Sequence, residues 1–347
     1  MIKIFSNMGT GTSYAIQNKL GEGMCGEVYK AWDKNSRTSW AIKTLKRSNF
    51  NSLKELKSEA MKEIDALLKV KHHENVVNLK EYFQKGKHFC LVMELCRGGT
   101  LNDFILQRSK DSVTNLRFMK QLSSGVAFLH EQGVVHRDLK PDNILIEFNN
   151  LGEPVVKISD FGLAKVFLET FNPSAQEKCI SRKYMRTCCG TPFFQAPETQ
   201  SFHYTHKADI FSLGAIFAAM MLKQKVQINT SQVGVKRDLL VVCMGNLTVA
   251  DYEIFFNMDY HLPADLWINP QLTLLLNSLL RKDYHERPGA YQLQCAIDKM
   301  SDKDVETDIW REIARKIEEA DERMIKKDRK RQRKQRRLNN WKKCTIL

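Results

Sequence analysis

The sequence predicts an α+β fold in which a small β-rich lobe is followed by a larger helical lobe. Over residues 14–94, short stretches enriched in β-branched and aromatic residues alternate with turn residues, which is typical of strands. From Thr100 onward, apolar residues recur every three or four positions, which is typical of helices. The 347 residues, of which 43% are hydrophobic and 27% are charged, are enough to bury one large two-lobed core.

Within the β-rich lobe, four stretches are expected to be strands. They are YAIQNKLGEG from Tyr14, GEVYKAWDK from Gly26, SWAIKTLK from Ser39 and FCLVMELC from Phe89. One helix is expected to interrupt them over residues 53–70. The buried face of that helix is expected to hold Leu56, Ala60, Ile64, Leu67 and Leu68.

Within the helical lobe, helical spacing is clearest over 116–131, 208–222 and 271–280. The stretch KQKVQINTSQVGVKRDLLVVCMGNLTVADYEIFF after Leu222 fits no single period and has no expected assignment. The nine cysteines show no C-x-x-C spacing, so we expect reduced thiols and an intracellular protein. No apolar run is long enough to span a bilayer.

The stretch LGEGMCGEVYKAW places three glycines at G-x-G-x-x-G spacing, which dinucleotide-binding loops also use. A dinucleotide loop would run directly into a helix, whereas Val28 and its neighbours continue as a strand. Gly21, Gly23 and Gly26 are therefore expected in a turn between two strands, where backbone N–H groups can approach phosphate oxygens. An ordinary glycine-rich hairpin is the alternative that this stretch alone leaves open.

A lysine follows this turn at the end of WAIK. A strand lysine that is wholly or partly buried needs an anion. Glu63 on the expected helix can supply that anion to Lys43, and Glu59, one turn earlier, is the substitute. A solvated strand lysine is the alternative reading of Lys43.

Two further stretches, VVHRDLKPDNILI and KISDFGLAK, contain the residue types that phosphoryl transfer requires. The carboxylate of Asp138 can accept or orient the proton of an attacking hydroxyl, and Asn143 and Asp160 can hold Mg²⁺ ions. These stretches follow the glycine turn and the lysine in the order that such a site needs. Together they indicate transfer of a phosphoryl group from ATP.

On these motifs, the chain resembles the eukaryotic protein kinases from Tyr14 to Met300. The resemblance implies a bilobal kinase fold that uses ATP and Mg²⁺ and acts on protein substrates. It divides the chain into an N-terminal extension over 1–13, a kinase domain over 14–300 and a tail over 301–347. Within the domain, the small lobe would cover about 14–94, the hinge about 94–97 and the large lobe about 98–300.

The resemblance also implies a role for each motif residue. Lys43, paired with Glu63, would hold the α and β phosphates of ATP. Asp138 would be the catalytic base, Lys140 would contact the transferred phosphate, and Asn143 and Asp160 would bind Mg²⁺. The ATP-binding positions it implies are Leu20, Gly21, Gly23, Gly26, Val28, Ala41, Lys43, Glu63, Met93, Glu94 and Cys96.

The acceptor and the regulatory residues are likewise implied by the resemblance. Lys140 within KPDN favours serine or threonine as acceptor of the γ-phosphate, and Thr191 would hydrogen-bond the catalytic aspartate. Arg137 would pair with a phosphate on Thr187 in the activation segment, with Ser181 as a second candidate. The stretch FMKQLSSGVAFLH and the long insertions are similar to the narrower PDZ-LIM-interacting kinase group.

Two structural roles and one specificity role complete the implied set. Asp209 would hold the backbone of the catalytic loop, and Arg287 would pair with Glu198 in the larger lobe. Asp142 stands where some kinases attract a basic residue of the substrate, whereas Thr100 replaces the other acid used for this. A mild preference for basic substrates is therefore one hypothesis. A kinase-fold scaffold with little catalysis, targeted by its tail, is the alternative function.

The tail combines an amphipathic stripe at helical spacing over 309–324 with a basic run. Residues 326–343 contain eleven Lys or Arg and one acid, so most of the formal charge of +14 lies there. The last four residues, beginning at Cys344, fit the C-a-a-X motif for prenylation, and a terminal Leu favours geranylgeranyl. One lipid beside a basic run would bind an anionic membrane surface on its cytoplasmic face.

Other uses of the tail remain open in the sequence. The basic run can be a nuclear import signal read by an importin, and Thr345-x-Leu347 can be a ligand of a PDZ domain. Prenylation removes the last three residues, so it excludes the PDZ use. Nucleic-acid binding is disfavoured, because Trp341 is the single aromatic residue in the basic run and no base-reading motif accompanies it.

Overall fold

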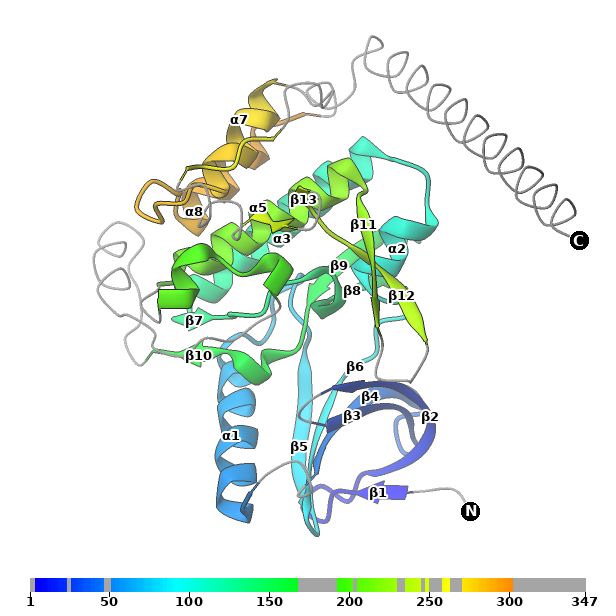
Figure 1. Ribbon diagram of the computed structural model, residues 1–347. Coiled ribbons are helices and arrows are strands. Elements are labelled where there is room, and N and C mark those ends of the chain that lie inside the picture. Colours follow the sequence, from blue (N-terminus) through cyan, green and yellow to red (C-terminus); the bar gives the residue numbers. More distant parts are fainter. Residues whose placement is uncertain are drawn as a thin grey trace, which may run out of the picture.

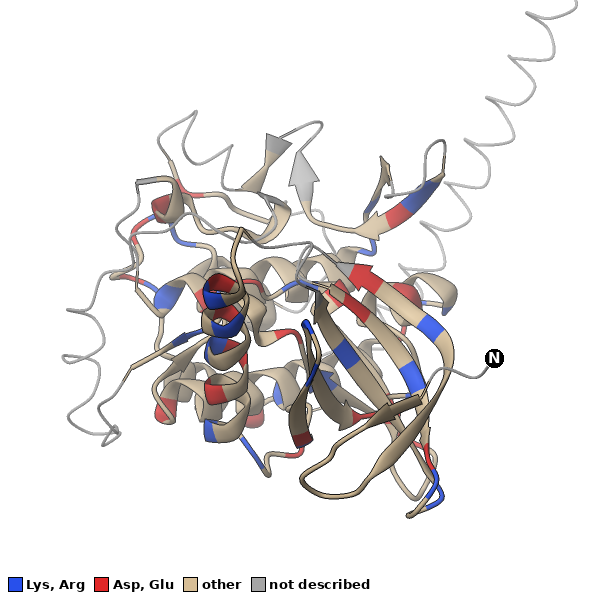
Figure 2. Cartoon of the chain, turned by 90° about the horizontal axis from the view of Figure 1, so that it is seen from below, with Lys and Arg blue, Asp and Glu red and all other residues tan. Residues whose placement is uncertain are grey.

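The computed structural model describes residues 4–23, 26–46, 51–167, 192–201, 205–229, 235–244, 247–249, 258–262 and 270–301. It shows a strand-rich lobe and a mainly helical lobe, with the helix α1 beside the first (Figure 1). Basic and acidic residues are interspersed over both lobes (Figure 2). None of the helices in the described ranges is long and apolar enough to cross a membrane.

The first lobe is built on one six-stranded antiparallel sheet. Its strands are β1 (Ile4–Ser6), β2 (Ser13–Gly23), β3 (Gly26–Asp33), β4 (Thr38–Lys46), β5 (Leu79–Lys85) and β6 (His88–Glu94), in the spatial order β1-β2-β3-β4-β6-β5. The four expected strand stretches supply β2, β3, β4 and β6. The sequence interpretation did not single out β1 and β5, which lie at the two edges of the sheet.

Alternation along the strands divides the core of this lobe in two. Phe89 and Leu91 of β6 join the main core that α1 covers, whereas Cys90 and Val92 join a second cluster with Phe5 of β1. Successive side chains of a strand point to opposite faces, which explains this division. The second cluster explains why β1, at the beginning of the chain, belongs to the sheet.

A polar contact brings the two edge strands together. Glu81 of β5 accepts hydrogen bonds from the Asn7 amide at 2.6 Å, from the Thr10 hydroxyl at 3.0 Å and from the Tyr14 hydroxyl. Lys85, also on β5, donates to the carbonyl of Ile4 on β1. The sheet is therefore strongly curled, as Figure 1 shows.

The helix α1 spans Leu53–Lys69, close to the expected 53–70. It begins where the Ser52 hydroxyl accepts a hydrogen bond from the backbone N–H of Glu55, a standard N-cap. Four of the five residues expected on its buried face are buried: Leu56, Ala60, Ile64 and Leu67. The prediction for Leu68 is wrong. It is 40% exposed, because it lies at the margin of a stripe that faces one sheet.

The second lobe is organised around a helix that is buried on all sides. The helices are α2 (Leu101–Gln107), α3 (Ser112–Glu131), α5 (Lys207–Leu222), α7 (Pro270–Leu279) and α8 (Ala290–Asp298). In α5, every residue from Lys207 to Met220 is buried, so the surrounding helices pack against it from several directions. The three expected helices correspond to α3, α5 and α7, each shifted or extended by one to four residues.

Short elements of this lobe carry the motif residues. They are the strands β7 (Val134–Val135), β8 (Ile144–Phe148), β9 (Pro154–Ile158) and β10 (Lys165–Val166), and the 3-10 turns η2 (Pro141–Asn143), η3 (Phe161–Leu163), η4 (Pro192–Phe194) and η5 (Pro197–Ser201). The stretch without an expected assignment forms two hairpins where the structure describes it. They are β11 (Lys225–Asn229) with β12 (Lys236–Leu240), and β13 (Cys243–Met244) with β14 (Leu247–Thr248).

Candidate active site

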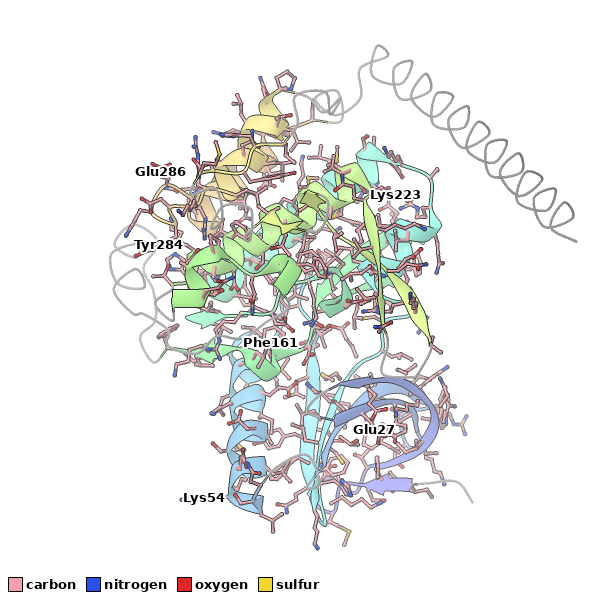
Figure 3. The ribbon with its side chains drawn as sticks, viewed as in Figure 1. Glu27, Lys54, Phe161, Lys223, Tyr284 and Glu286 are labelled. Carbon is pink, nitrogen blue, oxygen red and sulfur yellow. The ribbon has the colours of Figure 1, made fainter. Side chains whose placement is uncertain are left out.

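A lysine joins three elements at the junction of the two lobes. The ammonium group of Lys43 on β4 lies 2.6 Å from Glu63 Oε1 on α1 and 2.7 Å from Asp160 Oδ1, directly before η3. The next residue, Phe161, is buried at this junction and packs edge-on against the ring of His136 (Figure 3). The structure thus brings together three residues that are 20 and 117 positions apart in the chain.

The three charged groups differ in exposure and therefore in pKa. The attraction of Lys43 holds the pKa of Asp160 down at about 2, although burial opposes this. Burial raises the pKa of Glu63 and outweighs the attraction of the same ammonium group. Burial disfavours the charged form of Lys43 as well, but the two carboxylates raise its pKa. The lysine is therefore charged at neutral pH.

This cluster is incompletely satisfied within the protein. The buried Glu63 Oε2 has no hydrogen-bond partner among the residues that the structure describes. The Asp160 side chain is 49% exposed, while those of Lys43 and Glu63 are 11% and 2% exposed. An open carboxylate beside a fixed ammonium group is an arrangement that can receive a phosphate together with a cation.

Two residues of the site have left-handed backbone conformations that side chains other than glycine rarely adopt. Asp160 has φ 62° and Arg137 has φ 68°. The Arg137 side chain donates from Nε to the carbonyl of Leu163 at 2.6 Å, which ties the loop before β8 to η3. Strained backbone of this kind persists where the surrounding contacts fix it, and it is frequent at functional sites.

A second carboxylate is held by two neighbours on its own loop. Asp138 Oδ2 accepts hydrogen bonds from Lys140 Nζ at 2.9 Å and from Asn143 Nδ2 at 2.8 Å. The same amide nitrogen donates to the Asp138 carbonyl at 2.8 Å. With its nitrogen committed in this way, Asn143 would present its amide oxygen to a cation.

The oxygen donors of Asn143 and Asp160 suit Mg²⁺. This ion prefers oxygen ligands and is usually held by one or two carboxylates together with substrate phosphates. In the described part of the chain, no group of three or more His, Cys, Asp or Glu side chains could hold a metal ion by itself. A metal bound here would therefore depend on oxygens that the nucleotide brings.

Asp209 of α5 fixes the backbone of the loop that contains Asp138. Its carboxylate accepts from the backbone N–H groups of His136 at 2.8 Å and Arg137 at 2.9 Å. It also lies 2.9 Å from His130 Nε2 at the end of α3. Asp209 is 1% exposed, and although burial opposes ionisation, these hydrogen bonds lower its pKa. It therefore stays ionised and holds the loop in place.

Gly21 and Gly23 lie at the end of β2, and Gly26 begins β3. A Cβ on Gly26 would lie 2.0 Å from the carbonyl oxygen of Thr44 on β4, so this position requires glycine for close packing of strands. A Cβ on Gly21 would meet no atom within 4 Å. Gly23 pairs with Gly26 in the register of the two strands.

The remaining positions that the family resemblance assigns to ATP binding lie on neighbouring strands. Val28 pairs with Lys43, and Ala41 pairs with Met93 at the end of β6. Leu20 is 48% exposed on β2. These four side chains therefore belong to adjacent strands β2, β3, β4 and β6 of one sheet.

The segment that joins the lobes begins at Glu94. Its backbone N–H donates to the carbonyl of Asn78 at 3.0 Å, so this N–H is already used within the protein. Its carboxylate lies 3.0 Å from Lys157 Nζ. Cys96 follows in the same segment, where burial raises the pKa of its thiol to about 12. The thiol is therefore protonated and a poor nucleophile at neutral pH.

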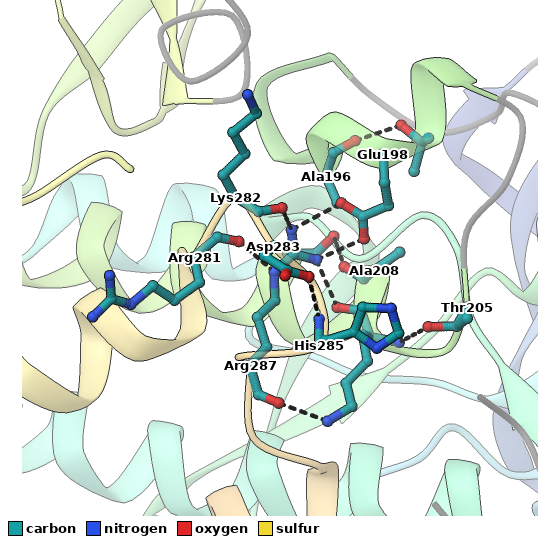
Figure 4. A network of polar contacts seen from close by, with 12 residues as sticks. Ala196, Glu198, Thr205, Ala208, Arg281, Lys282, Asp283, His285 and Arg287 are labelled. Atoms are coloured by element: carbon teal, nitrogen blue, oxygen red, sulfur yellow. Dashed lines mark hydrogen bonds and ion pairs between the residues drawn. The ribbon is translucent and has the colours of Figure 1, made fainter. Parts of the chain in front are cut away.

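A separate buried network lies deeper in the helical lobe (Figure 4). Arg287 donates from Nη1 to Glu198 Oε1 at 2.6 Å and from Nη2 to Glu198 Oε2 at 2.8 Å. Its other donors reach the backbone carbonyls of Arg281, Lys207 and Lys282. The pair of Arg287 with Glu198 is the one that the family resemblance implies.

Four of the residues singled out in the sequence lie outside the described residues: Thr187, Thr191, Ser181 and Cys344. The structure also shows a contact that the sequence interpretation missed, the hydrogen bond of His130 to Asp209. No local sequence signal indicated this contact. His130 lies within an amphipathic helix, and the helical periodicity accounted for its position without a polar partner. Glu59, the substitute partner for Lys43, instead lies 2.5 Å from Lys62 at the surface.

Comparison with known proteins agrees with this geometry. Residues 14–296 match the family model described as protein kinase domain. Serine/threonine-protein kinase 33 of Bos taurus is 35% identical over 215 residues, and probable serine/threonine-protein kinase fhkC of Dictyostelium discoideum is 35% identical over 213 residues. Each match covers 60% of this chain but only 42% and 33% of the respective relative.

The family match covers most of the chain and both of its lobes. The curled antiparallel sheet, the helical lobe and the order of the motifs are those that the family implies, so the predicted bilobal α+β kinase fold is confirmed. The chain belongs to the protein kinase family.

Proposed function

We propose that this protein is an ATP-dependent serine/threonine kinase that transfers the γ-phosphate of ATP to hydroxyl groups of proteins. The observation that carries the proposal is the ammonium group of Lys43, held at once by Glu63 and Asp160. This contact fixes α1, the sheet and the residue before η3 in one arrangement. Such an arrangement is needed for phosphoryl transfer in kinases. The similarity to serine/threonine kinases supports the choice of acceptor.

Within this proposal, each side chain has a physical task. Lys43 offers positive charge to the α and β phosphates, and Glu63 keeps it in place. The oxygens of Asp160 and Asn143 hold Mg²⁺, which supplies the charge that the phosphates need for transfer. Lys140, 2.9 Å from Asp138, offers a second positive charge near the transferred phosphate.

Asp138 would orient the acceptor hydroxyl and receive its proton. Its loop is fixed by Asp209, so the carboxylate keeps its position while the substrate binds. A small pocket beside Asp138 is lined by residues 194–196 and by Ala208, Asp209 and Ser212 of α5.

A phosphotransfer assay tests the proposal. Glu63→Gln keeps the shape of the side chain but removes the charge that holds Lys43, and we expect a loss of about 100-fold in kcat/KM. Glu59→Gln is the matched control on the same helix, because its exposed contact with Lys62 does not reach the site. We expect this control to keep wild-type activity.

Asp138→Asn tests the proposed base in the same assay, with a generic protein substrate and ATP. We expect loss of transfer, because an amide cannot accept the proton. Equal activity of wild type, Glu63→Gln and Asp138→Asn would refute the proposed enzyme. It would instead support the alternative of a kinase-fold scaffold with little catalysis.

Finer proposals concern the subgroup of kinases and residues that lie outside the described ranges. We propose membership of the PDZ-LIM-interacting kinase group, phosphorylation of Thr187 read by Arg137, and prenylation of Cys344 next to the basic run. The nuclear and PDZ uses of the tail are the alternatives. Imaging of wild type against Cys344→Ser tests the lipid anchor, since an unchanged location would refute it.

A further inference from the structure

The β11–β12 hairpin places an arginine next to the catalytic loop. Arg237 on β12 donates from Nη1 to Asp142 Oδ1 at 2.7 Å and from Nη2 to Asp142 Oδ2 at 2.8 Å. Both oxygens of the carboxylate are engaged, in the bidentate geometry that is the strongest form of this pair. The two residues are 95 positions apart, so the hairpin must fold back to make the contact.

The carboxylate in this pair lies at the edge of the proposed active site. Asp142 belongs to the single turn η2, as does Asn143, whose amide holds Asp138. An extended peptide rises about 3.3 Å per residue. Because Asp142 directly precedes Asn143, which contacts Asp138, we expect a substrate that presents its hydroxyl to Asp138 to carry residues within about three positions of the acceptor past Asp142.

The hairpin is anchored directly after Arg237. The buried side chain of Asn102 on α2 donates to the carbonyl of Asp238 at 3.1 Å and accepts from the N–H of Leu240 at 2.7 Å. Leu239 and Leu240 are buried in the main core. Arg237 is therefore held at its place by the fold, while its side chain stays 41% exposed to an arriving peptide.

We propose that Arg237 is a specificity-determining residue that occupies the carboxylate to which a basic side chain of the substrate would otherwise bind. This inference rests on the proposed kinase function and identifies the substrate class. Peptides with neutral residues around the acceptor are accepted, and a basic residue near the acceptor gains no advantage. The hypothesis of a mild basic preference, drawn from Asp142 alone, is replaced by one in which the chain's own arginine cancels that preference.

Removal of the guanidinium exposes an acidic site. Asp142 would lose both of its bonds to Arg237, and Asp103 on α2, which also attracts Arg237, adds a second negative charge nearby. An arginine of the substrate would then find the bidentate partner that Arg237 now takes. The variant enzyme is expected to prefer basic peptides that the wild type does not distinguish.

The test uses the full chain and a serine peptide with neutral flanks, in which arginine replaces each residue within three positions of the acceptor. For wild type, we expect kcat/KM with arginine to stay within about twofold of the neutral peptide at every position. For Arg237→Ala, we expect kcat/KM to be about fivefold higher with the arginine peptide than with the neutral peptide at one position or more. Activity on the neutral peptide should not change.

Two controls separate the ion pair from other effects of the substitution. Lys225→Ala removes the partner of Asp238 on the same hairpin, 2.5 Å away, and should behave as wild type. The double variant Asp142→Asn, Arg237→Ala should again show no preference for arginine at any position of the peptide, because the exposed carboxylate is gone. Arg237→Gln, which keeps a polar side chain of similar length, should show the same gain as Arg237→Ala.

Binding of fluorescent copies of the same peptides gives a readout that does not depend on transfer. The arginine peptide should bind Arg237→Ala about fivefold more tightly than wild type. A wild type that transfers no phosphate to any peptide would refute the proposed function, and the binding data would still decide this inference. Equal arginine preference of wild type and Arg237→Ala, in both rate and binding, would overturn it.

Discussion

Two buried ion-pair networks of this protein differ in how completely they are satisfied. Arg287 in the helical lobe has five N–H donors, and all five have partners, two of them on Glu198. Lys43 at the lobe junction is held by two carboxylates, of which one, Asp160, is half exposed. The other, Glu63, keeps a buried oxygen with no partner in the described residues.

This difference separates a network that maintains the fold from one that can bind a ligand. A saturated network has no donor or acceptor left, so a ligand could only break its bonds. In an unsaturated network, the unpaired group lowers the stability of the fold, and a bound phosphate or cation can offset this loss. The degree of hydrogen-bond satisfaction is thus a physical criterion for telling the two regions apart.

The largest effect on stability is expected from breaking the saturated network. Arg287→Ala removes both hydrogen bonds to Glu198, a mostly buried carboxylate, and the hydrogen bonds to three backbone carbonyls. Removal of one partner of a buried pair costs about 3–5 kcal/mol. Urea unfolding should show a fall of this size in the free energy of unfolding. A fall below about 1 kcal/mol, the range of surface pairs, would contradict the structural role.

The next largest effect is expected from Lys43→Met, which should lower activity far more than stability. Loss of the charge that would hold the phosphates should lower kcat/KM by about 100-fold or more. The cost in stability should stay below about 2 kcal/mol, because Glu63, whose pKa burial already raises, can take up a proton. Unfolding and phosphotransfer measurements on one preparation check both. A loss of stability as large as for Arg287→Ala would remove the distinction between the regions.

Much of this site could be predicted from the sequence, because its residues lie in short motifs with fixed spacing. Asp138, Lys140 and Asn143 fall within six positions, so one loop conformation brings them together whatever the rest of the chain does. The contact of Lys43 with Glu63 was harder to predict, since it depends on how a helix packs against a sheet. The helical period placed both Glu59 and Glu63 near the lysine, and only the packing of α1 selects the second.

Long-range contacts that involve residues outside the family motifs could not be predicted. Arg237 lies in a stretch without clear periodicity, and its pairing with Asp142 requires the hairpin to fold back over 95 positions. The strand β1 was missed for a similar reason. Its three residues join the sheet through β2, and Asn7, directly after them, donates to Glu81. A segment this short has no alternation to detect.

A smaller effect is expected from acid, and it should appear at the lobe junction. The folded-state pKa of Asp160, about 2, lies below its ordinary value of 3.8. Its stabilising contribution is therefore complete above pH 3.8 and is lost as the pH falls toward 2. The side chain is 49% exposed, so solvent screening weakens this contribution. Between pH 6 and pH 3, we expect its loss to lower the free energy of unfolding by about 0.5–1 kcal/mol.

Comparison of wild type with Asp160→Asn isolates this contribution, because titration of distant carboxylates is common to both proteins. Urea unfolding at several pH values should show the wild type losing stability faster than the variant as the pH falls. Parallel curves for the two proteins would show that the ion pair with Lys43 contributes nothing to the pH dependence of stability.

The smallest effect is expected from Arg281→Ala, a change beside the saturated network. Arg281 lies 2.5 Å from Asp259 and 3.8 Å from Glu286, and its side chain is 38% exposed. Its backbone carbonyl accepts from Arg287, and this bond survives the substitution because it does not involve the side chain. Exposed ion pairs contribute about 0.2–1 kcal/mol, so the free energy of unfolding should fall by no more than that.

The comparison with Arg287→Ala then concerns two arginines six positions apart with the same charge. One is exposed with carboxylate partners that water can replace, and the other is buried with every donor engaged. If both substitutions cost the same, charge alone would explain the stability of this region. If Arg287→Ala lowers the free energy of unfolding at least three times as much as Arg281→Ala, burial and full hydrogen bonding explain the stability of this region. Water cannot replace the partners that Arg287 holds.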